Sequence, residues 1–81
     1  MNILKTISTE YLRASRTLET VLISDENISD VFFIYNYEGV SYRVFKTQWD
    51  LIDFFRDNTE NYLHFKTENE VDDFLAEVKL V

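Results

Sequence analysis

The stretch that decides the fold is residues 31–46, VFFIYNYEGVSYRVFK, in which two strand-like runs surround a single glycine. Residues 31–37 are aromatic and β-branched, and residues 40–46 alternate in polarity, as strands do. Gly39 is the one glycine of the chain, and a tight hairpin needs a positive φ, which glycine adopts without strain. These residues therefore predict two antiparallel strands joined by a turn at Gly39.

The segment before this hairpin contains one predicted helix and one predicted strand. Residues 2–15 predict a helix, because Ile3, Ile7 and Tyr11 recur at four-residue spacing. Residues 17–24 are rich in β-branched side chains and favour a strand, with continuation of the helix as the alternative.

Two further helices are predicted from the residues that begin them. Thr47 can cap a helix over residues 47–57, and Thr67 with Glu70 forms a full capping box for a last helix over residues 67–78. Both segments are amphipathic, so each helix is expected to bury one face.

Length and element order together predict the fold class. Residues 1–81 make a single domain, and the state of residues 62–65 stays open. The expected order is helix, strand, strand, strand, helix, helix. This order predicts an α+β domain with a three-stranded antiparallel sheet covered by helices on one face.

Charge is concentrated in the second part of the chain. The net charge is −7, from 15 acidic and 8 basic side chains. Residues 1–23 hold three basic and two acidic side chains, whereas residues 24–81 hold five basic and thirteen acidic ones. Direct contact with nucleic acid is not expected, because phosphates are bound by Lys and Arg. A basic protein is the expected partner.

The last predicted helix is the most acidic element. It carries five acidic side chains: Glu68, Glu70, Asp72, Asp73 and Glu77. Like charges at helical spacing cost about 0.2–0.5 kcal/mol per pair. A solvated surface is the alternative, since the helix dipole favours acids in the first turn. That alternative does not explain Asp73 and Glu77, and we expect these five residues to bind a partner.

The preceding helix repeats the pattern more weakly. Asp50, Asp53 and Asp57 share one face, and Arg56 is close enough to neutralise part of it. Carboxylates on neighbouring turns lie about 5–6 Å apart, a spacing comparable with that of phosphates along a nucleic-acid strand. Asp50 and Asp53 are therefore added to the expected partner-binding residues.

The hairpin tip is a third candidate site. It consists of six residues: Asn36, Tyr37, Glu38, Gly39, Val40 and Ser41. An ordinary solvated turn is one interpretation. The other is a protruding tip in which an exposed Tyr37 beside Glu38 anchors a partner.

Several kinds of site are not expected. The chain has no cysteine and one histidine, His64, so neither a disulfide nor a zinc site is predicted. No calcium loop or catalytic motif is present, and we expect no enzyme, metal or cofactor. No apolar run is long enough to cross a bilayer, and the cytosol is the expected location. Lys5, Arg13 and Arg16 are expected on a solvated helix face.

The residues also resemble a known family. The stretch over residues 26–45, ENISDVFFIYNYEGVSYRVF, the expected order of elements and the acidic helix over residues 67–78 together resemble the small acidic type II-A anti-CRISPR proteins. Members of that family inhibit guide-loaded Cas9 by covering the surface that reads the PAM, as DNA mimics.

This resemblance implies a partner and roles for particular residues. The partner would be Cas9 with its guide RNA, in the cytosol of a bacterial host infected by a phage. Glu68, Glu70, Asp72 and Asp73 would face the PAM-reading arginines, and the hairpin tip would be inserted. Two alternatives stay open. The chain could be an immunity protein that neutralises a basic nuclease toxin, or an acidic interaction module with another partner.

Overall fold

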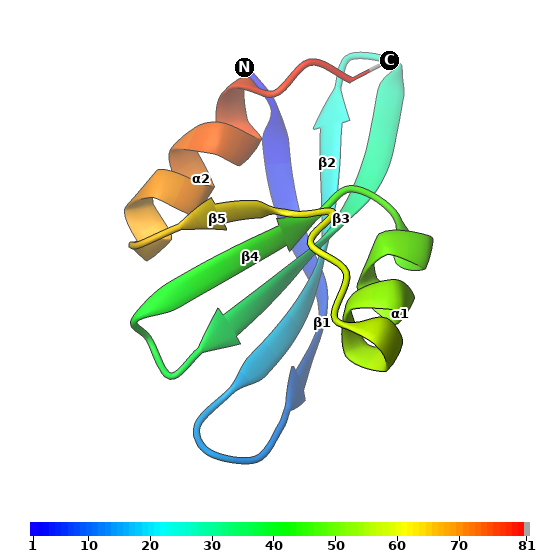
Figure 1. The fold of residues 1–81 in the computed structure, drawn as a ribbon. Coiled ribbons are helices and arrows are strands. Elements are labelled where there is room, and N and C mark those ends of the chain that lie inside the picture. The colour runs from blue at the N-terminus through cyan, green and yellow to red at the C-terminus, as the bar shows by residue number, and fades with distance from the viewer. Residues whose placement is uncertain (81) are drawn as a thin grey trace.

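The computed structural model describes residues 1–80, which form one antiparallel sheet and two helices (Figure 1). The elements in chain order are β1 (Ile3–Tyr11), β2 (Thr17–Asp25), β3 (Ile28–Tyr37), β4 (Ser41–Phe45), α1 (Gln48–Asp57), β5 (Leu63–Phe65) and α2 (Glu68–Glu77). The five strands lie in the sheet in sequence order, so each pairs with its neighbour along the chain.

The predicted element order is wrong at the N-terminus. Ile3–Tyr11 is a strand paired with β2 and not a helix. Ala14 and Ser15 have φ values of 59° and 57°, which turn the chain back and exclude a right-handed helix there. The i, i+4 apolar spacing was misleading because Ile3 is 73% exposed and Tyr11 is 84% exposed, so this stripe covers no core.

The sheet is also larger than predicted. It has five strands and not three, because β1 extends one edge and β5 (Leu63–Phe65) forms the other. The sequence left residues 62–65 unassigned, since a three-residue strand has no periodicity of its own. The observed order of elements is ββββαβα, whereas the predicted order was αβββαα.

The central hairpin and both helix starts are confirmed. β3 pairs with β4, and Glu38 and Gly39 both adopt positive φ, at 55° and 74°. Thr47 and Thr67 are the N-caps, and each side-chain oxygen accepts a hydrogen bond from a backbone N–H three residues later, at 3.1 and 3.2 Å.

Helices cover both faces of the sheet, whereas one face was predicted. α2 packs on a core that contains Ile34 of β3 and Val44 of β4. α1 packs on a second core that contains Tyr35 and Phe45, the next residues along the same strands. Successive side chains of a strand point to opposite faces, so the two helices lie on opposite sides, at the left and right of Figure 1.

The start of the chain is tied to the end of α2. The buried Asn2 donates from Nδ2 to the carbonyl oxygens of Leu75 and Val78, at 2.9 and 2.7 Å, and its backbone N–H donates to Ala76. These bonds satisfy carbonyl groups that the last turn of a helix leaves unpaired. They therefore fix α2 against the sheet next to β1.

Among the elements over residues 1–80, no helix has the length and apolar character needed to cross a membrane.

Candidate partner-binding surface

The outer side of α2 presents a row of exposed carboxylates. Val71 and Leu75 are buried against the sheet, which turns the remaining sides of the helix to solvent. All five predicted acids of this helix are exposed: Glu68, Glu70, Asp72, Asp73 and Glu77. Within residues 1–80, the ion pairs involve Arg56 of α1 and none of these five acids. This acidic surface is therefore available to cations from outside the chain.

A sixth carboxylate joins this surface from the sheet. Glu19 of β2 lies with Glu68 and Asp72 at a shallow hollow between the sheet and the start of α2. Burial raises the pKa of the Glu19 carboxyl, and the charges of Glu68 and Asp72 raise it further. A cation placed among these three groups would relieve that repulsion. We call Glu19 and the five acids of α2 the α2 acidic surface.

Sequence reasoning missed Glu19. It lies in the part of the chain with a small positive net charge, so its contribution to an acidic surface was not expected. The signal was present in β2, because Glu19 is two residues before Val21 and four before Ile23, and all three lie on the α2 face. Only the packing of α2 on that face places the carboxylate beside Glu68.

The acids of α1 belong to a different surface. Asp50 and Asp53 are partly buried on the opposite side of the sheet from α2. Arg56 lies 3.7 Å from Asp53 and 3.3 Å from Asp57, so part of this stripe is neutralised within the helix. The two predicted acidic stripes are therefore not continuous.

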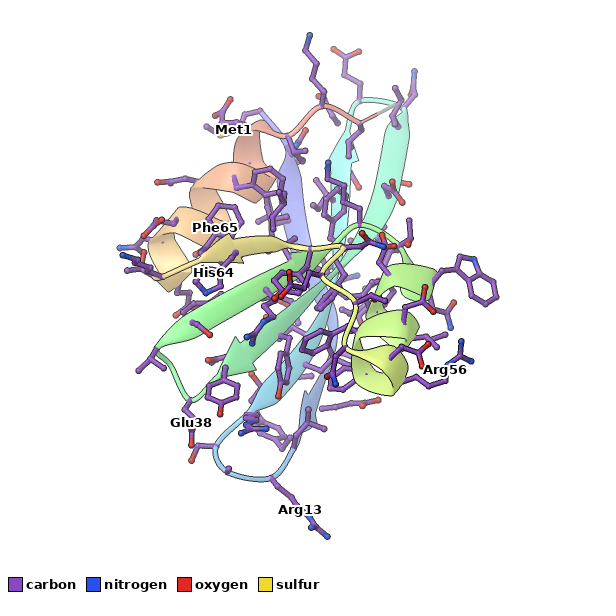
Figure 2. The ribbon with its side chains drawn as sticks, viewed as in Figure 1. Met1, Arg13, Glu38, Arg56, His64 and Phe65 are labelled. Carbon is purple, nitrogen blue, oxygen red and sulfur yellow. The ribbon has the colours of Figure 1, made fainter. Side chains whose placement is uncertain are left out.

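The hairpin tip is stabilised by its own hydrogen bonds. The Oδ1 atom of Asn36 accepts from the backbone N–H of Gly39 at 2.8 Å, and Val40 N–H donates to the carbonyl of Tyr37 at 3.1 Å. Asn36 thus has a structural role in the turn. Glu38, Gly39 and Val40 are exposed, and Glu38 is labelled at the end of the hairpin in Figure 2.

Tyr37 does not extend from the tip as an exposed anchor. It is half-buried, and the guanidinium carbon of Arg16 lies 4.0 Å from the centre of its ring. Ser41 at the other side of the turn is also partly buried and pairs with Tyr37 across the hairpin. The exposed part of the tip is therefore limited to residues 38–40.

Side chains of metal-ligating type are not gathered into a cluster in the part of the chain that the structure describes. No group of three or more His, Asp or Glu side chains is placed to hold a metal ion there. His64 is exposed on β5 beside Phe65 (Figure 2), with no such cluster around it.

Comparisons of the chain with models of protein families, with curated proteins and with solved structures found no match.

Proposed function

We propose that the chain is an inhibitor that binds a basic, nucleic-acid-binding protein through the α2 acidic surface and thereby occupies a DNA-binding site. The observation that supports this proposal is the set of five exposed carboxylates on one ten-residue helix, with no basic residue on that helix. Arg binds carboxylate and phosphate with the same fork geometry. A row of carboxylates can therefore take the place of a phosphate backbone.

Guide-loaded Cas9 is the first partner that we propose. The resemblance to type II-A anti-CRISPR proteins rested on three features, and the helix-first order of elements is one that the structure corrects. The other two features are the turn at Gly39 and the acidic last helix, and both are present. The proposal for Cas9 depends on these two features.

The α2 acidic surface is better suited to bind a basic partner than the other predicted sites. Asp50 and Asp53 lie on the opposite face of the sheet, and the charge of Asp53 is partly neutralised by Arg56. The exposed tip at residues 38–40 carries one acid, Glu38. We therefore expect the largest effects on binding from α2 and smaller ones from these residues.

Cleavage of target DNA by a panel of type II-A Cas9 proteins, with and without the chain, tests the proposal. We expect inhibition of at least one member and direct binding that weakens between 50 and 200 mM salt, as charge-driven contacts do. The same assay with a basic nuclease toxin domain tests the alternative that the chain is an immunity protein. Undiminished cleavage by every Cas9, with no binding, would exclude Cas9 as the partner.

Charge reversal locates the binding surface. The double variant Asp72→Lys/Asp73→Lys should bind at least about tenfold more weakly and with a smaller salt dependence, because it replaces attraction by repulsion. The matched control is Asp25→Lys/Glu26→Lys, which makes the same change in net charge at the exposed β2–β3 turn. Equal weakening by both variants would show that total charge, and not α2, is responsible.

A further inference from the structure

The side of the sheet that faces α1 holds a pocket of about 340 Å³ with positive charge. It lies between β3, β4 and α1, and its lining includes Arg16, Arg43, Tyr35, Tyr37, Phe54 and Asn58. Arg16 comes from the β1–β2 turn and was expected on a solvated helix face, but it is half-buried here. With Phe55, which also lines it, the pocket combines two guanidinium groups with four aromatic rings.

Both arginines lie against rings and not against carboxylates. The Arg16 guanidinium carbon is 4.0 Å from the centre of the Tyr37 ring, and that of Arg43 is 5.3 Å from the centre of Phe54. Neither arginine forms an ion pair within residues 1–80. Glu38 at the hairpin tip is the acid whose charge acts on Arg16.

The arginines also have unused hydrogen-bond donors. The Nε atoms of Arg16 and Arg43 are buried and have no hydrogen-bond partner. Among residues 1–80, the one hydrogen bond that either side chain makes is a long contact of 3.4 Å from Arg16 Nη1 to the hydroxyl of Tyr35. Buried donors are normally satisfied, and leaving one unpaired costs free energy. Both guanidinium groups therefore lie in the pocket without an acceptor that satisfies them fully among residues 1–80.

We propose that this pocket binds an oxyanion, a phosphate or a carboxylate, carried on an aromatic ring. The guanidinium groups supply charge and donors for the oxyanion, and the rings of Tyr35, Tyr37 and Phe54 supply the surface on which an aromatic group packs. The volume is at the lower end of the range for ligand pockets, which suits one ring with one anionic group.

The pocket is separate from the α2 acidic surface. Tyr35 on the α1 face and Asn36 on the α2 face are consecutive residues of β3, so the sheet itself lies between the two sites. Binding of an anion here is therefore a second property, which does not depend on the proposed inhibition. Failure of one test leaves the other unchanged.

The direct test follows the Nε–Hε signals of the arginines by NMR in the wild-type chain. The probes are phenyl phosphate and benzoate as aryl oxyanions, inorganic phosphate as an anion without a ring, and phenol as a ring without an anionic group. We expect saturable shifts of the Arg16 and Arg43 signals with at least one aryl oxyanion. Its affinity should exceed that of inorganic phosphate by about tenfold, because the ring adds contacts. Phenol should cause little change.

Substitutions test whether the NMR shifts arise from binding of the oxyanion in the pocket. Arg43→Gln should weaken binding of the aryl oxyanion by at least about tenfold, the loss expected for a charged hydrogen-bonded contact. Arg56→Gln is the matched control, because Arg56 is an exposed arginine of α1 outside the pocket, and it should bind as the wild type does. Shifts that stay linear without saturation, or that affect Arg56 as much as Arg16 and Arg43, would overturn the proposal.

Discussion

The two faces of the sheet carry charged groups of opposite sign in their hollows, although the same strands build both. On the α2 face, Glu19 lies with Glu68 and Asp72, and no basic side chain among residues 1–80 pairs with them. On the α1 face, Arg16 and Arg43 lie among aromatic rings in a pocket beside the helix, and no carboxylate of the described residues pairs with them.

This difference follows from the alternation of side chains along β3 and β4. In β3, Ile34 faces α2 and Tyr35 faces α1, and in β4 the corresponding residues are Val44 and Phe45. A shift of one residue in register would exchange the faces. The strand register therefore determines which charged side chains lie on which face. We expect a substitution on one face to leave the charge of the other face unaltered.

The largest predicted effect comes from the buried side chains that fill the two cores. Phe45 on the α1 face and Leu75 on the α2 face are both 0% exposed. Phe45→Ala should lower the free energy of unfolding by about 3–5 kcal/mol, and Leu75→Ala by about 2–5 kcal/mol. Urea titration followed by circular dichroism in the far and near ultraviolet measures both losses.

The control for these variants is Val40→Ala, because Val40 is 68% exposed at the hairpin tip and should change stability by less than about 0.5 kcal/mol. The two spectral ranges should report one transition, since β3 and β4 contribute to both cores. Transitions that do not coincide would contradict two-state unfolding of the two cores as one unit.

Asn2 is predicted to have the next largest effect, and it acts on the α2 face. Asn2→Ala removes two hydrogen bonds to Leu75 and Val78 and should lower the free energy of unfolding by about 1–3 kcal/mol, because partly buried carbonyl groups lose their donor. Hydrogen exchange in the last turn of α2 should increase. Asn69→Ala on the exposed side of α2 is the control, and an equal loss there would argue against this role.

The arginines of the α1 face should give a smaller effect. Arg43→Gln removes contacts with the rings of Phe54 and Tyr62, both 5.3 Å from its guanidinium carbon, and should cost about 0.5–2 kcal/mol. Arg56→Gln removes exposed ion pairs and should cost at most about 1 kcal/mol. Thermal unfolding at low and high salt distinguishes the two variants. Salt screens the exposed ion pairs of Arg56 but not the contacts of Arg43 with the rings, so only the loss caused by Arg56→Gln should depend on salt. A larger loss for Arg56→Gln would contradict the comparison.

Glu19 is predicted to give the smallest effect, which depends on pH. Its pKa is raised in the folded chain, so the fold disfavours the charged carboxylate. The native state then binds the proton more tightly than the unfolded state, and stability falls as pH rises from the ordinary glutamate pKa through the raised one. Glu19→Gln should therefore be more stable than the wild type at pH 7, and this gain should disappear near pH 4.

Neutralising the neighbours tests the cause of that shift. In a Glu68→Gln/Asp72→Asn background, the gain from Glu19→Gln at pH 7 should become smaller, because two of the charges that raise the pKa are absent. Urea titrations of the four variants at both pH values provide this comparison. An unchanged gain would assign the whole shift to burial.

Local chemistry predicted the parts of the fold whose cause lies within a few residues. Gly39 marked the β3–β4 turn, and Thr47 and Thr67 marked the starts of both helices. The strand over residues 17–24 was also predicted, because its β-branched residues favour an extended backbone.

The errors arose where distant segments decide the conformation. Spacing alone suggested a helix for Ile3, Ile7 and Tyr11, but hydrogen bonds to β2 make this segment a strand. For the candidate site, residue type and spacing predicted that the acids of α2 are exposed, which the structure confirms, and their role in binding stays a prediction. Glu19 was missed because nothing in its own segment indicates that α2 packs beside it.

By itself, the sequence determined the turn at Gly39, the capped starts of both helices and the acidic outer side of α2. Each of these depends on φ preference, a side chain three residues away or helical spacing, and all act over short distances. The tertiary structure alone decided that β1 is a strand, that the helices occupy opposite faces and that Arg16 and Arg43 line one pocket. These features depend on strand pairing and register between distant residues, which no local pattern specifies.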